Sequence, residues 1–97
     1  MKSLSIPPKA AAKSDSTEIM RLWLVRERSG GSVHITLRHD VWTDPAMWGL
    51  MLVDIARHVS RAHAQSGKDE NAVFDQIIAG LRAEIESPTD DPKGQIE

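Results

Sequence analysis

The residues of this chain that could carry chemistry gather in residues 39–63. Asp54 and His58 stand four residues apart, so their side chains are neighbours on a helix, and the carboxylate could orient the imidazole as a general base. No nucleophile completes this pair, because Ser60 lies on another side of the helix and the chain has no cysteine or tyrosine. We therefore interpret Asp54 and His58 as a solvated surface pair and assign no catalytic residue. The whole group is His39, Asp40, Trp42, Asp44, Trp48, Asp54, His58 and His63.

The histidine spacing does not encode a metal site. His58 and His63 are five residues apart, about 140° around a helix, so one ion could not easily bind both. His39-Asp40 is a pair that metal phosphohydrolases use, but only together with further ligands that this sequence does not present. A glycine-rich phosphate loop is also missing from the sequence. We expect the protein to hold neither a metal ion nor a cofactor.

The two tryptophans of this stretch have two interpretations. Trp42 and Trp48 could clamp a base or a small ligand between their rings. Alternatively, Trp48 at the start of a helix packs back on the entering chain, in the manner of a hydrophobic staple. Trp48 lies at the centre of the apolar side of the predicted helix, which favours packing.

A long helix explains most of the stretch. Asp44 precedes Pro45, which makes Asp44 a natural N-cap and Pro45 the first helical residue. The helix should run from about Pro45 to about Gln65 and stop at Gly67. Its apolar side covers an arc of about 240°, much wider than the stripe of an ordinary surface helix. The centre of this arc is formed by Trp48, Met51, Leu52, Ile55, Val59 and Ala62.

A β-hairpin is predicted before this helix. Gly30-Gly31 can supply the two positive φ angles of a type I′ turn. With the turn there, Trp23 opposes Arg38 and Glu27 opposes His34, giving one cation–π pair and one opposite-charge pair on the outer face. The inner face is then apolar and consists of Met20, Leu22, Leu24, Val33, Ile35 and Leu37.

A second helix follows from about Glu70 to about Glu86, with Asp69 as its N-cap. Its apolar residues form one face, about 140° wide, typical of a helix that packs on one side. The fold class is therefore α+β, a β-hairpin followed by two α-helices in the order β-β-α-α. We expect the helices to pack on one face of the sheet.

Length and composition complete the outline. The 97 residues divide into a disordered arm over 1–16, a single α+β domain over 17–87 and a disordered tail over 88–97. Residues 1–39 carry a net charge of +4 and residues 69–97 carry −6, which favours attraction between the two ends, either within one molecule or between molecules. The absence of cysteine, of a secretory leader and of an apolar run of about 20 residues predicts a small soluble cytoplasmic protein.

The start of the predicted long helix also resembles a known protein family. The pattern Trp42-x-Asp44-Pro45-x-x-Trp48-Gly49-x-x-Leu52-x-Asp54-x-x-x-His58, after a short hairpin, resembles a family of small bacterial proteins known only as a domain of unknown function. The resemblance covers about residues 17–65. It is the pattern of a capped docking helix, and it implies no activity, cofactor or catalytic residue.

The leading functional hypothesis is a small non-catalytic module for protein interaction or homodimerisation. A two-stranded sheet is marginal by itself, and the long helix has more apolar surface than its neighbours can cover. The expected contact residues are apolar side chains on the outer sheet face and beside the polar strip of the helix: Ile19, Trp23, Val25, Leu50 and Val53.

Two alternatives remain open at this level. The first is a weak nucleic-acid binder that uses the arginines of the hairpin, although the isoelectric point of about 6.1 is low for such a protein. Its contacts would be Arg21, Arg26, Arg28 and Arg38. The second is a small-ligand binder or an enzyme built around Trp42, Asp54 and His58. We expect neither a membrane nor a small-molecule substrate as the main partner.

Overall fold

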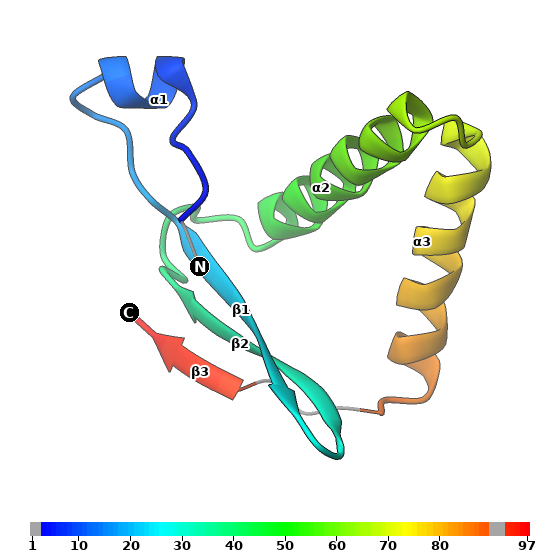
Figure 1. Ribbon diagram of the computed structural model, residues 1–97. Helices are drawn as coiled ribbons and strands as arrows, with labels where there is room; N and C mark the ends of the chain where they lie inside the picture. The colour runs from blue at the N-terminus through cyan, green and yellow to red at the C-terminus, as the bar shows by residue number, and fades with distance from the viewer. Residues whose placement is uncertain (1–2, 90–92) are drawn as a thin grey trace. The chain divides into compact units, whose positions relative to one another are not determined.

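The computed structural model describes residues 3–89 and 93–97 and has the predicted α+β class (Figure 1). The order β-β-α-α is confirmed for the hairpin and the two long helices, with a short helix before them and a strand after them. That the helices pack on one sheet face stays a prediction. The elements are α1 Pro8–Ala12, β1 Met20–Glu27, β2 Gly30–Leu37, α2 Ala46–Gln65, α3 Glu70–Glu86 and β3 Lys93–Ile96.

The chain forms two compact units, because β1 packs mainly with β2, and α2 packs mainly with α3. The sheet unit comprises the described residues up to His39 together with Gly94–Glu97, and the helical unit comprises the described residues of Asp40–Lys93. Residues 17–87, expected to form a single domain, are thus divided between the two units.

The predicted hairpin register is wrong, and each residue of β1 pairs with a residue four positions earlier in β2 than expected. Trp23 pairs with His34 instead of Arg38, and Glu27 pairs with Gly30 instead of His34. The observed register instead places apolar residues of the two strands directly opposite each other, and these cross-strand contacts outweigh the charge pairs that we expected. The apolar pairs are Met20 with Leu37, Leu22 with Ile35, and Leu24 with Val33.

The turn explains the shift in register. The two residues between the strands are Arg28 and Ser29, and neither has a positive φ. A type I′ turn needs positive φ at both central positions, so it is excluded here. Gly30 follows the turn and takes φ +119°. Each side chain still lies on its predicted face of the sheet, because the pairing shifts by four residues, an even number.

A third strand extends the sheet beside β2, giving the order β1-β2-β3. It lies in the segment 88–97 that we expected to be a disordered tail. The amide of Glu97 donates to the carbonyl oxygen of Leu37 at 2.8 Å. Gly94 has φ +128°, and a side chain there would overlap the backbone of Ile35. Glycine at position 94 is therefore what lets β3 approach β2 so closely.

In the N-terminal arm, also expected to be disordered, α1 is a single five-residue turn of helix without a buried side chain. Pro8 occupies its first position, where the missing amide hydrogen has no helical partner to lose.

The ends of the two long helices agree with the sequence. The Asp44 carboxylate accepts a hydrogen bond from the amide of Ala46 at 3.0 Å, and Asp69 accepts one from the amide of Asn71 at 3.3 Å. Pro45 already has helical angles, so the start of α2 differs from the prediction by one residue. Gly67 takes φ +94° just after the helix, as expected of its stop residue.

The α2–α3 contact is made by small residues of α2. Ala56 and Ser60 are 5% and 1% exposed, and the Ser60 hydroxyl donates to the carbonyl oxygen of Ala56 at 2.7 Å. On α3, Val73 is the buried residue. All three lie in the parts of the helices nearer the connecting turn, and the helices diverge away from it (Figure 1). Leu81 and Ile85, farther along α3, are exposed.

Polar contacts add to this helix pair. The guanidinium of Arg57 lies 4.6 Å from the centre of the Phe74 ring, a cation–π contact. Arg61 and Glu70 form a long ion pair at 3.9 Å. Because Arg61 and Glu70 are exposed, their pair contributes little to stability.

Replacing Asp44 by alanine should destabilise the protein. The Asp44→Ala change removes the acceptor for the Ala46 amide, and losses of this kind cost about 0.5–2 kcal/mol. Urea denaturation should show a lower midpoint, whereas Asp40→Ala, which removes a carboxylate outside the helix start, should leave the midpoint nearly unchanged. Equal midpoints for the two variants would reject Asp44 as the cap.

Replacing Ser60 by leucine should also destabilise the helical unit. Ser60 is fully buried at the contact with α3, so a larger side chain must push the helices apart, at a cost of about 1–3 kcal/mol. The matched control is Ala79→Leu, at an exposed position of α3. Thermal denaturation should show a clearly lower midpoint for Ser60→Leu alone. A midpoint as high as that of the control would mean that α3 does not pack here.

Candidate interaction surface

The largest apolar side chains of α2 are not the ones buried at its contact with α3. We call them the α2 stripe and define it as Trp48, Met51, Leu52, Ile55 and Val59. Leu52 and Ile55 are 48% and 43% exposed. The stripe is the centre of the apolar arc predicted from the sequence, whereas α3 packs against one edge of that arc, around Ala56 and Ser60. Within the helical unit, Val59 is also exposed and Trp48 and Met51 are half-buried, so this apolar row is only partly covered.

The start of the stripe is held by the two tryptophans. The rings of Trp42 and Trp48 lie edge to face, with centroids 5.2 Å apart and an angle of 83° between their planes. Edge-to-face is one of the preferred packing geometries of aromatic rings. A clamp for a planar ligand would instead hold two rings parallel with a gap between them. The arrangement therefore agrees with the packing interpretation.

A second open surface is the apolar side of the sheet. We call it the leucine face, and it comprises Met20, Leu22, Leu24, Val33, Ile35 and Leu37. Leu22 and Leu24 are 53% and 56% exposed, and the β2 residues Ile35 and Leu37 are half-buried. Within the sheet unit, the predicted inner face of the hairpin is thus largely uncovered.

The contact residues proposed from the sequence divide between the two units. Trp23 and Val25 are exposed on the sheet face opposite the leucine face, and Ile19, at the start of that face, is half-buried. Leu50 and Val53 are exposed on α2. Sequence reasoning therefore chose accessible apolar residues, but it treated the α2 stripe and the leucine face as a covered core. The 240° arc was the signal that could have identified the stripe as a surface.

The polar residues that suggested catalysis are not assembled into a site. Asp54 and His58 are both exposed, and the structure records no hydrogen bond between them. His39 lies in the sheet unit, and its ring nitrogen Nδ1 is 3.4 Å from the carbonyl oxygen of Glu97. In the described part of the chain, histidine and carboxylate side chains nowhere form a group of three that could hold a metal ion.

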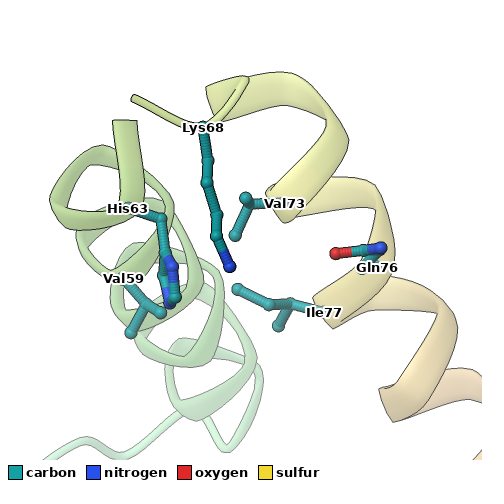
Figure 2. Close-up of a pocket in the computed structure, with 6 residues that line it drawn as sticks. All are labelled: Val59, His63, Lys68, Val73, Gln76 and Ile77. Carbon is teal, nitrogen blue, oxygen red and sulfur yellow. The ribbon is translucent and has the colours of Figure 1, made fainter. Parts of the chain in front are cut away.

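A small hollow lies between α2 and α3 near their connecting turn (Figure 2). It has a volume of about 250 Å³, an apolar side and a polar rim. Figure 2 shows the Lys68 side chain extending into the space between the helices, past His63. The sequence analysis did not single out Lys68 or Gln76, since neither belongs to a recognisable pattern. The lining residues are Val59, His63, Lys68, Val73, Gln76 and Ile77.

The hairpin arginines do not form one basic surface. Arg21 and Arg26 lie on opposite faces of β1, because residues separated by an odd number point to opposite sides of a strand. Arg28 lies in the turn at one end of the hairpin. Arg21 forms an ion pair with Glu18 at 2.9 Å, and Arg38 donates to the Glu18 carbonyl oxygen at 3.1 Å. A continuous track for a phosphate backbone would need these cations on one side.

Comparisons with known proteins agree with the fold. A solved structure from the photosynthetic bacterium Rhodopseudomonas palustrus CGA009, described as "a putative pyruvate dehydrogenase", is similar over 94% of this chain and 90% of its own. The two share 33% sequence identity, with a TM-score of 0.72. No curated protein matches the chain. In the described residues, no helix combines the length and the hydropathy that a membrane span requires.

The resemblance noted at the helix start is confirmed at the level of the family. The family model of a domain of unknown function, DUF5076, matches residues 3–89, which include both the hairpin and the two long helices. The chain belongs to the DUF5076 family.

Proposed function

We propose that this protein is a small non-catalytic interaction module that works as a homodimer. The observation that carries the proposal is the α2 stripe, a row of large apolar side chains left open beside a helix contact made of small ones. Among the described residues, the buried apolar side chains are only Ala56 and Val73. Within the two units, so little burial does not offset the conformational entropy of ordering the chain, and we propose that contact with a second copy contributes the rest.

The description of the Rhodopseudomonas protein adds no reaction to this proposal. It belongs to that protein, and the residues that suggested catalysis in this chain, Asp54 and His58, are exposed and unassembled. We propose a cytoplasmic location, because the chain has no cysteine and so does not depend on an oxidising compartment.

The test is the oligomeric state. Sedimentation equilibrium of the full chain at micromolar concentration should show a dimer. Ile55→Glu places a charge in the middle of the α2 stripe and should raise the dimer dissociation constant at least about tenfold, because an unpaired buried carboxylate is strongly unfavourable. Trp23→Glu and Leu50→Glu test the other exposed apolar positions in the same way.

The matched control is Ala79→Glu, which adds the same charge at an exposed position of α3 outside the stripe. It should leave the dissociation constant nearly unchanged. Circular dichroism of each variant checks that its helices still form. A wild-type chain that stays monomeric up to millimolar concentration would refute the proposed function.

A further inference from the structure

We propose that the hollow between α2 and α3 is a binding site for a short aliphatic monocarboxylate. This site goes beyond the interaction module proposed above and does not depend on it. All six lining residues belong to the helical unit and lie on α2, on α3 or in the turn that joins them. The shape of the hollow and the chemistry of its walls are therefore set within that unit alone.

The apolar side of the hollow selects the carbon chain of the ligand. It is formed by three branched aliphatic side chains, Val59 of α2 and Val73 and Ile77 of α3. Val73 is buried and Ile77 is half-buried. The volume of about 250 Å³ lies below the range of about 300–1,000 Å³ that is usual for drug-sized ligands. The hollow therefore suits an apolar group of only a few carbon atoms.

The Lys68 ammonium selects the charge of the ligand. Figure 2 shows that this side chain turns inward and ends between His63 on the α2 side and Ile77 on the α3 side. The turn is held by its backbone, because the amides of Ser66 and Lys68 both donate to the His63 carbonyl oxygen, at 3.0 and 3.2 Å. In the part of the chain that the structure describes, no carboxylate forms an ion pair with Lys68. An ammonium placed in this way can bind an anion through a charge-assisted hydrogen bond.

Two further polar groups beside Lys68 suit a carboxylate. The imidazole of His63 and the side-chain amide of Gln76 line the hollow, and each can donate a hydrogen bond to a carboxylate oxygen. None of the six lining residues is acidic. The helical unit as a whole has five basic and ten acidic side chains, a net charge of −5, which repels a doubly charged anion more than a singly charged one. A single carboxylate is therefore favoured over a phosphate group.

A titration of the full-length chain with sodium butyrate tests the site. The backbone amide signals of Val59, Val73 and Ile77 should shift in nitrogen-15 NMR spectra. The dissociation constant should be about 1–10 mM, as expected for a ligand of six non-hydrogen atoms. Acetate should bind at least about fivefold more weakly, because it lacks two of the methylene groups that the apolar side would cover. Butanol should also bind at least about fivefold more weakly, because it has no charge for Lys68.

Three variants separate the Lys68 ammonium from the overall charge. Lys68→Gln should raise the butyrate dissociation constant at least about fivefold, whereas Lys68→Arg should stay within about twofold of the natural chain. The matched control is Arg82→Gln, which removes one positive charge at an exposed position of α3 that does not line the hollow. Its dissociation constant should be nearly unchanged. Sodium chloride at the same ionic strength should not shift the three amide signals.

Each contrary outcome has one meaning. Unchanged signals for Val59, Val73 and Ile77 at about 50 mM butyrate, several times the expected constant, would overturn the proposed site. Equal affinities of the natural chain and Lys68→Gln would overturn it as well, as would shifts that sodium chloride reproduces. Tight binding of butanol would reject the carboxylate as the recognised group. The oligomeric state in sedimentation is measured separately, so none of these results refutes the proposed homodimer.

Discussion

The width of the apolar arc on α2 is the constraint on which the rest of this structure depends. A helix with about 240° of apolar surface cannot be covered by one neighbour, since a single helix contact covers little more than a stripe. In this chain α3 packs against the edge of α2 that carries small residues, because Ala56 and Ser60 allow the helix backbones to approach closely. Within the helical unit, the large side chains of the α2 stripe are then only partly covered. This apolar surface of α2 stays accessible within the helical unit because α3 packs against the edge of α2 that carries small side chains.

The sheet meets a related constraint. A hairpin of two strands is marginal in water, and β3 extends it to three strands by pairing with β2 through Gly94. This pairing satisfies the backbone groups along one edge of β2, but it adds no layer above or below the sheet. Leu22 and Leu24 therefore remain exposed. Backbone pairing and side-chain burial are separate requirements, and within the sheet unit only the first is met.

The conspicuous residues at the start of α2 serve to build the helix. Asp44 accepts a hydrogen bond from the amide of Ala46, and Trp42 packs edge to face on Trp48. Both are local contacts that fix where the helix begins and how the chain enters it. The tryptophan, aspartate and proline pattern at this point thus builds the helix start, and the exposed Asp54 and His58 lie outside these two contacts.

The sequence alone determined the two hairpin strands and the two long helices, because their signals are local. Periodicity placed both long helices, Asp44, Asp69 and Gly67 marked their ends, and alternation assigned the strand residues to two faces. Tertiary structure decided three further things, since each depends on residues far apart in the chain. The register followed from apolar pairs such as Leu22 with Ile35. The strand β3 pairs with β2 where Gly94 fits against Ile35, a contact that no local sequence pattern indicates. Close packing against α3 decided which side of α2 is buried. Small side chains fit there better than the large ones that dominate the hydrophobic pattern.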